Sequence, residues 1–120
     1  MPIVKNDLLG RKALEIYQDT DGFNFSMDTM LLADFVSITA RTKRICDLCS
    51  GNAPIPLYLT LKTSAKIVGV EIQKESYDLA IRSIEENHLE NQITMVLDNL
   101  KDISSKIGKN CYEVVTCNPP

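Results

Sequence analysis

The chain has 120 residues, of which 44% are hydrophobic and 24% charged, and its formal net charge is −3. This length suits one compact domain, and the composition excludes a disordered chain, which would be poorer in apolar residues and further from charge balance. No apolar run reaches the roughly 18 residues that a membrane-spanning helix needs. The first twelve residues lack an apolar stretch preceded by a basic one, so we expect no signal peptide.

The charge and the cysteines indicate a compartment and a class of partner. A protein that holds nucleic acid by charge alone is usually basic, and this chain is not. Basic and acidic side chains balance at six each in residues 1–44, which makes that part the better candidate for contact with a polyanion. Without an export signal, we expect reduced thiols and a cytoplasmic protein.

The pair Cys46 and Cys49 forms a C-x-x-C pattern, which raises the possibility of a redox pair or half a zinc site. Both cysteines fall in a run that reads as a buried strand, where residues three apart point to opposite faces. No second C-x-x-C completes a set of four ligands. We therefore expect no metal site, and we expect the single histidine, His88, to be a surface residue near a helix end.

The N-terminal 43 residues are expected to form a small unit of their own. Residues 1–13 are mixed and predict a flexible start, followed by a short strand over residues 14–17. Residues 18–22, Gln-Asp-Thr-Asp-Gly, are a strong turn signal, so residues 23–25 are expected to pair back as a hairpin. Ser26 is a good N-cap, and apolar residues at helical spacing predict an amphipathic helix over residues 27–38.

From residue 44 the pattern becomes regular. Strands are predicted over residues 44–49, 65–70, 93–97 and 112–117, and helices over residues 55–61, 75–87 and 100–107. The second of these strands is almost wholly apolar, which is typical of strands buried on both faces of a parallel sheet. The alternation predicts an α/β fold with a doubly wound, Rossmann-like parallel sheet of about four strands over residues 44–120.

In such a sheet, ligands bind beyond the carboxyl ends of the strands, and two features at those ends point to an adenosine cofactor. The first is the loop Asp47-Leu-Cys-Ser-Gly-Asn-Ala53, in which Gly51 lets the backbone approach a ligand closely. Asp47 either accepts a hydrogen bond from the ligand or orients the turn. The second is Glu71, an acid that ends the second strand about 20 residues later, a position that typically binds ribose hydroxyls.

Two further features follow the third and fourth strands. Asp98 can accept a hydrogen bond from an adenine amino group, with Asn99 and Leu100 beside the ring, or it can cap the next helix. Asn118-Pro119-Pro120 is the most specific signal in the chain. Two prolines fix the backbone, and their carbonyls with the Asn118 amide form a rigid set of acceptors for a planar amino group.

Taken together, Gly51, Glu71, Asp98 and Asn118-Pro-Pro120 resemble the motif series of class I S-adenosylmethionine-dependent methyltransferases. Asn-Pro-Pro is typical of members that methylate exocyclic amino or amide nitrogens. The N-terminal segments Asp7-Leu-Leu-Gly10 and Phe23-Asn-Phe-Ser-Met-Asp28 narrow the resemblance to the bacterial tRNA(Val) adenine-N6 methyltransferases, the small-domain methyltransferases. This implies methyl transfer to the N6 of an adenine in tRNA.

The resemblance also implies roles for individual residues. Asn118, Pro119 and Pro120 would hold the target amine. The residues that would bind or border the cofactor are Ser26, Asp28, Asp47, Cys49, Gly51, Asn52, Glu71, Ile72, Asp98, Asn99, Leu100 and Asn118. Ala53 departs from the family by standing where glycine is usual, and because Pro54 follows, we expect Ala53 to be extended.

Two other interpretations stay open at the level of sequence. Asn-Pro-Pro also serves enzymes that methylate a protein glutamine amide or a guanine amine of rRNA. The chain ends before the aromatic residue that would stack on the target base, which predicts a truncated chain and leaves open a non-catalytic, cofactor-binding fragment. A fourth strand at the end of the sheet would leave an exposed edge, which predicts self-association.

Overall fold

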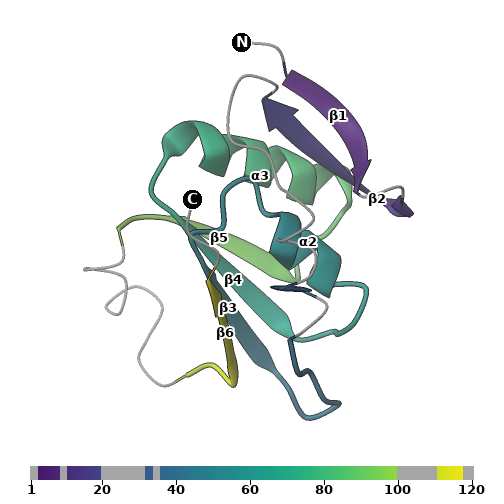
Figure 1. Cartoon of the computed structure of the whole chain (residues 1–120), viewed down its shortest axis with the longest axis vertical. Coiled ribbons are helices and arrows are strands. Elements are labelled where there is room, and N and C mark those ends of the chain that lie inside the picture. The colour runs from purple at the N-terminus through teal and green to yellow at the C-terminus, as the bar shows by residue number, and fades with distance from the viewer. Residues whose placement is uncertain (1–2, 9–10, 20–31, 34–35, 100–110, 118–120) are drawn as a thin grey trace.

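The computed structural model describes residues 3–8, 11–19, 32–33, 36–99 and 111–117. Figure 1 shows a short antiparallel hairpin at one end of the molecule and a larger sheet below it, with helices between the two. The elements are β1 (Ile3–Leu8), β2 (Arg11–Asp19), β3 (Arg44–Leu48), α2 (Pro54–Leu59), β4 (Lys66–Glu71), α3 (Lys74–Glu86), β5 (Ile93–Leu97) and β6 (Val114–Cys117).

The four-stranded sheet is parallel and has the order β5-β4-β3-β6. This confirms the predicted α/β fold with a Rossmann-like sheet. The chain first steps outward from β3 to β4 and β5, and then returns to place β6 on the other side of β3. The point where strand order reverses therefore lies between β3 and β6, where open α/β sheets bind their ligands.

The two faces of the sheet have different surroundings. Alternate residues of the strands, among them Ile45, Ile67 and Ile93, join the main core with α2, α3 and β2. Both helices lie on this face because right-handed crossovers that step in one direction place them there. The opposite face carries a smaller cluster around Cys46 and Val70, with Tyr112 packed against it.

Helix α2 is short but wholly buried, from Pro54 to Leu59. Proline is tolerated in the first turn because no intrahelical partner exists there for a backbone N–H. The helix begins one residue earlier and ends two residues earlier than predicted. Its burial brings Leu57 and Leu59 into the core, so the segment directly after the first strand is held rigidly in place.

The predicted strand over residues 14–17 is part of the longer strand β2, which extends into residues expected to form the turn. β2 pairs with β1, with Ile3 opposite Asp19 and Lys5 opposite Tyr17. The expected flexible start thus contains a strand, whereas residues 23–25, the predicted hairpin partner, lie outside the described residues. The register is set by β2, whose side chains Leu14 and Ile16 are buried against α2 and α3, and β1 then completes the hydrogen bonds of one edge of β2.

The helix predicted over residues 27–38 extends too far. Residues 32 and 33 are helical, whereas residues 36–39 are not, and most of the remaining positions lie outside the described residues. The Nζ atom of Lys62 donates hydrogen bonds to the carbonyl oxygens of Ala33 at 3.2 Å and Val36 at 3.4 Å. A cation at these carbonyls favours a helix end, because the last carbonyl groups of a helix lack intrahelical partners.

The remaining strands and helices match the prediction within about two residues. β6 begins at Val114 rather than at residue 112, and α3 begins one residue before the predicted start. His88 follows α3 with a φ of 58° and is exposed, as expected for a residue that ends a helix. The helix predicted over residues 100–107 lies outside the described residues.

Candidate functional site

The carboxyl edge of the sheet brings together three of the predicted segments. Glu71 ends β4, and its backbone carbonyl accepts a hydrogen bond from the N–H of Asp98 at 3.0 Å. The N–H of Ser50 donates to the carbonyl of Val70 at 2.8 Å. The loop after β3, the end of β4 and the turn after β5 therefore form one continuous rim.

Glu71 is the residue that joins these segments. Its carboxylate oxygen Oε1 accepts a hydrogen bond from the N–H of Gly51 at 2.8 Å, and Oε2 accepts one from the N–H of Gln73 at 2.9 Å. The side chain is only 8% exposed. Each carboxylate oxygen has a further lone pair, so the group can still accept hydrogen bonds from a ligand's hydroxyls.

Asp47 is buried, and both of its carboxylate oxygens accept hydrogen bonds from other residues of the chain. Its Oδ2 accepts a hydrogen bond from the hydroxyl of Ser50 at 2.6 Å, and its Oδ1 accepts one from the hydroxyl of Thr116 at 2.5 Å. Burial raises the pKa of this carboxyl to about 6, although the two hydroxyl donors act in the opposite direction. Of the two roles expected for Asp47, this geometry is that of a residue that orients the turn.

The loop after β3 has an unusual backbone. Three of its residues have positive φ angles, namely Cys49 at 57°, Gly51 at 59° and Ala53 at 71°. The prediction that Ala53 is extended is wrong, because its φ and ψ of 71° and 40° lie in the left-handed region. The bend that leads the chain into α2 outweighs the preference of a residue before proline, and glycine, which lacks a Cβ, would suit the position best.

Space opens in front of Gly51. A Cβ atom added at this residue would meet nothing within 4 Å. Beside it on the rim, Ile72 is 65% exposed, which is unusual for a large apolar side chain. The space at Gly51 thus lies next to the carboxylate of Glu71 and the apolar side chain of Ile72. The carboxylate can bind a sugar hydroxyl, and the apolar side chain can contact the flat face of a ring.

The turn after β5 is built by Asp98. Its Oδ1 accepts a hydrogen bond from the N–H of Asn99 at 2.8 Å, a local contact that shapes the turn. Both residues are half-buried at the same edge as Glu71. The predicted cofactor positions Gly51, Glu71, Ile72 and Asp98 are thus gathered on one rim.

Asn52 lies in the loop but turns toward the N-terminal hairpin. Its Nδ2 atom donates a hydrogen bond to the carbonyl oxygen of Tyr17 at 2.8 Å, and the residue is 5% exposed. The amide nitrogen of Asn52, one of the predicted cofactor residues, thus connects the loop to the N-terminal hairpin.

All four cysteines are free thiols. Cys46 is buried, whereas Cys49 turns toward Cys117 at the end of the neighbouring strand. Burial, followed by the contact with Cys117 and nearby carboxylates, raises the pKa of Cys49. The two sulfurs of the C-x-x-C pattern have separate surroundings, because Cys46 lies in β3, whereas Cys49 lies in the loop after it, with a φ of 57°.

Sequence reasoning missed three residues that shape the loop: Ser50, Thr116 and Gly69. Ser50 and Thr116 donate to Asp47, as described above. A Cβ added at Gly69 would lie 2.6 Å from Sδ of Met95 and 2.7 Å from Oγ of Ser50, so only glycine lets the loop pack directly on β4. A glycine inside an apolar strand is the signal that could have revealed this close approach.

Several predicted residues lie outside the described residues. These are Ser26, Asp28, Leu100, Asn118, Pro119 and Pro120. Their roles remain predictions from sequence. The end of β6 at Cys117, opposite Leu48, nevertheless places the chain next to the loop after β3 just before Asn118.

Comparison with known proteins decides the family. Residues 24–120 match the family described as the methyltransferase small domain. The chain belongs to this family. Among curated relatives, the tRNA1(Val) (adenine(37)-N6)-methyltransferase of Bacteroides fragilis is 23% identical over 109 residues, which are 91% of this chain and 46% of that protein. The ribosomal protein uL3 glutamine methyltransferase of Bordetella pertussis is 26% identical over 90 residues, 74% of this chain and 29% of that protein.

Solved methyltransferase structures share the fold. The METTL16 MTase domain has a TM-score of 0.76 at 20% identity, with 94% of this chain and 49% of that chain covered. The M. capricolum TrmK structure in complex with S-adenosyl-homocysteine has a TM-score of 0.65 at 21% identity, with 78% and 40% covered. The chain spans less than half the length of the curated relatives it matches. Within the described part of the chain, no helix is long and apolar enough to cross a membrane.

Proposed function

We propose that the chain is the cofactor-binding part of an S-adenosylmethionine-dependent N-methyltransferase that acts on the N6 of an adenine in tRNA. The observation that carries the proposal is the hydrogen bond between Glu71 and the N–H of Gly51, which places an acid beside the open space at Gly51 on the carboxyl edge of the sheet, where ligands of this fold bind. Membership of the methyltransferase small domain family supports it. We place the protein in the cytoplasm.

The rim fits the proposed cofactor. Glu71 keeps acceptor capacity for the two ribose hydroxyls, because each of its oxygens takes only one backbone N–H. The exposed side chain of Ile72 offers an apolar surface to the adenine, and Asp98 stands on the far side of Glu71 as an acceptor for its amino group. Gly51 leaves room for the methionine part.

The bound cofactor would supply an electrophilic methyl group on a sulfonium. The task of the protein is then to align an amine with it. We assign this to Asn118, Pro119 and Pro120, whose carbonyl and amide oxygens would accept hydrogen bonds from the amino group and direct its lone pair. The assignment rests on the sequence motif and on the position of the preceding residue, Cys117, beside the loop after β3.

A glutamine amide of ribosomal protein uL3 is the second candidate for the methyl acceptor. Ribosomal protein uL3 glutamine methyltransferases are also relatives, at 26% and 27% identity. A glutamine side-chain amide and an adenine amino group both present a planar N–H₂, which the same acceptor set can hold. The tRNA relative covers more of this chain, 91% against 74%, and for this reason we favour adenine.

Two measurements test the proposal. Isothermal titration of the chain with S-adenosylhomocysteine should give saturable binding with a stoichiometry of one. Transfer of labelled methyl groups should then be compared on tRNA, rRNA and purified ribosomal protein uL3, using the longest natural form of the protein. Absence of cofactor binding would overturn the methyltransferase assignment, and label on uL3 alone would replace tRNA by glutamine as the acceptor.

A further inference from the structure

Among the described residues, side chains cover the edge of β2 that faces away from β1. In an antiparallel pair, alternate residues turn their backbone groups away from the partner strand, and in β2 these are Glu15 and Tyr17. The N–H of Glu15 donates to Oδ1 of Asn87 at 2.9 Å, and its carbonyl accepts from Nδ2 of Asn87 at 2.7 Å. The amide of Asn87 thus pairs with β2 as a strand residue would.

Tyr17 continues this edge. Its N–H donates to the hydroxyl oxygen of Ser83 at 2.8 Å, and its carbonyl accepts from the Nδ2 atom of Asn52 at 2.8 Å. Ser83 is fully buried, and its hydroxyl in turn donates to the carbonyl of Leu79 at 3.0 Å. Each of the four outward backbone groups of Glu15 and Tyr17 therefore has a side-chain partner from α3, the residue after it, or the loop after β3.

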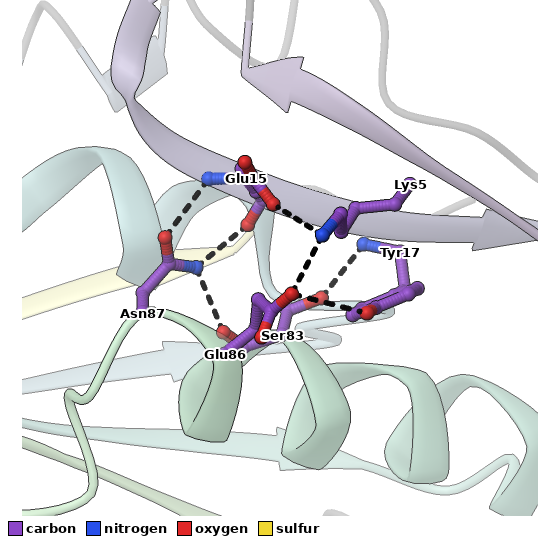
Figure 2. A network of polar contacts seen from close by, with 6 residues as sticks. All are labelled: Lys5, Glu15, Tyr17, Ser83, Glu86 and Asn87. Atoms are coloured by element: carbon purple, nitrogen blue, oxygen red, sulfur yellow. Dashed lines mark hydrogen bonds and ion pairs between the residues drawn. The ribbon is translucent and has the colours of Figure 1, made fainter.

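Charged and aromatic contacts reinforce the same junction. Lys5 of β1 forms ion pairs with Glu15 at 3.0 Å and with Glu86 of α3 at 2.7 Å. Figure 2 shows its ammonium group between these two carboxylates. The guanidinium of Arg82 lies 4.1 Å from the centre of the Tyr17 ring. Lys5, Glu86 and Arg82 are solvent-exposed, so we assign the specificity of docking to the amide and hydroxyl contacts, which are partly buried.

Asn52 is the link in this arrangement that belongs to the proposed cofactor site. It stands between Gly51, whose N–H binds Glu71, and Ala53, whose N–H binds the carbonyl of Ser50 at 2.9 Å. Its neighbours on both sides have positive φ angles. A loop with this backbone needs outside contacts to hold it, and the carbonyl of Tyr17 is one.

We propose that Asn52 is a positioning residue through which the N-terminal hairpin, docked on α3 by Ser83 and Asn87, holds the loop around Gly51 in its ligand-binding shape. The consequence for cofactor affinity rests on the proposed function, whereas the consequence for the loop itself does not. The hairpin thereby becomes part of the cofactor site although none of its described residues stands on the rim.

The test removes the contacts of Ser83 and Asn87 with β2, which lie away from Asn52 and the loop. Ser83→Ala removes the acceptor of the Tyr17 N–H, and Asn87→Asp turns the donor to Glu15 into an acceptor, while Asn52 and the rim keep their residues. Asn91→Asp, an exposed change at the opposite edge of the sheet, is the matched control for added charge. Hydrogen exchange of the unliganded chain should show faster exchange of the Gly51 and Ala53 amides in the first two variants only.

Cofactor affinity gives the second readout. With S-adenosylhomocysteine as the probe, Ser83→Ala and Asn87→Asp should each weaken binding by about three- to tenfold, as expected for one lost hydrogen bond, and Asn91→Asp by less than about twofold. In the natural enzyme the loss should appear in KM for the cofactor and leave kcat unchanged.

The outcomes separate the two proposals. If residues 11–19 exchange faster in the variants but Gly51 and Ala53 do not, the hairpin and the loop are uncoupled and the inference is overturned. If the wild-type chain binds no S-adenosylhomocysteine, the proposed function fails, and the exchange experiment still decides the coupling. Should Asn87→Asp prevent folding, Ser83→Ala, which adds no charge, carries both measurements.

Discussion

Glu71 accepts a hydrogen bond from the backbone N–H of Gly51 across the gap between two neighbouring strands, at 2.8 Å. The two residues are 20 positions apart in sequence, and each belongs to a different predicted motif. Their contact joins the two predicted motifs in one site, because the carboxylate of Glu71 fixes the position of the Gly51 backbone that a ligand would contact.

Glu71→Gln should weaken binding of S-adenosylhomocysteine by at least about tenfold. The amide keeps one oxygen, so one of the two N–H donors, from Gly51 or Gln73, would face an amide N–H₂ group, and a buried unsatisfied donor costs about 1–3 kcal/mol. Isothermal titration and thermal unfolding measure the two effects. Glu75→Gln, an exposed change in the first turn of α3, is the control and should leave both unchanged.

Gly69→Ala should destabilise the protein by about 1–3 kcal/mol, because the new methyl group would overlap Met95 and the hydroxyl of Ser50. Met95 can move, but Ser50 is held by its hydrogen bond to Asp47. Urea unfolding at constant m-value measures the loss. A Gly69→Ala protein as stable as wild type would mean that the loop does not rest on β4 as described.

Ala53→Gly should cost less stability than Ala80→Gly by about 1–2 kcal/mol. Both alanines are fully buried, so each change removes the same methyl contacts. Ala53 has a φ of 71°, where glycine relieves strain, whereas Ala80 lies inside α3, where glycine is unfavourable. Parallel denaturant titrations of the two variants compare them, and equal losses would contradict the left-handed backbone at Ala53.

The pKa of Asp47, raised to about 6 by burial, predicts a pH dependence of stability. The folded state holds this proton more tightly than the unfolded state, so the carboxyl contributes stability that is fully present below about pH 4 and is lost as pH rises through 6. Between pH 4 and pH 7 the contribution changes by up to about 3 kcal/mol.

Asp47→Asn isolates this contribution, because the amide does not titrate and the other carboxyl groups are common to both proteins. The difference in unfolding free energy, wild type minus variant, should fall as pH rises from 4 to 7. A difference that stays constant over this range would show that Asp47 ionises normally in the folded chain.

Much of the fold follows from the order of apolar runs in the sequence. The strands β3, β4, β5 and β6 are short apolar segments separated by helical patterns, and this alternation allows little besides a parallel sheet. Since the carboxyl ends of parallel strands share one edge, the sequence also predicted that Gly51, Glu71 and Asp98 would meet. Contacts between their segments confirm that arrangement.

Other features were decided only in three dimensions. β2 pairs with β1 along one edge, and along its other edge it is bound by Ser83, Asn87 and Asn52, residues up to 72 positions away in sequence. Local turn signals at residues 18–22 carry no information about such distant side chains.

The direction in which polar side chains point was likewise set by tertiary packing. Asp47, in β3, and Asn52, in the loop after it, belong to a segment whose sequence suggests ligand contacts, yet Asp47 binds Ser50 and Thr116, and the Asn52 amide binds Tyr17. Buried polar groups must find partners wherever packing places them. The sequence by itself therefore determined the sheet and the edge that carries the site, whereas the tertiary structure decided which residues of the loop face that edge and which hold it in place.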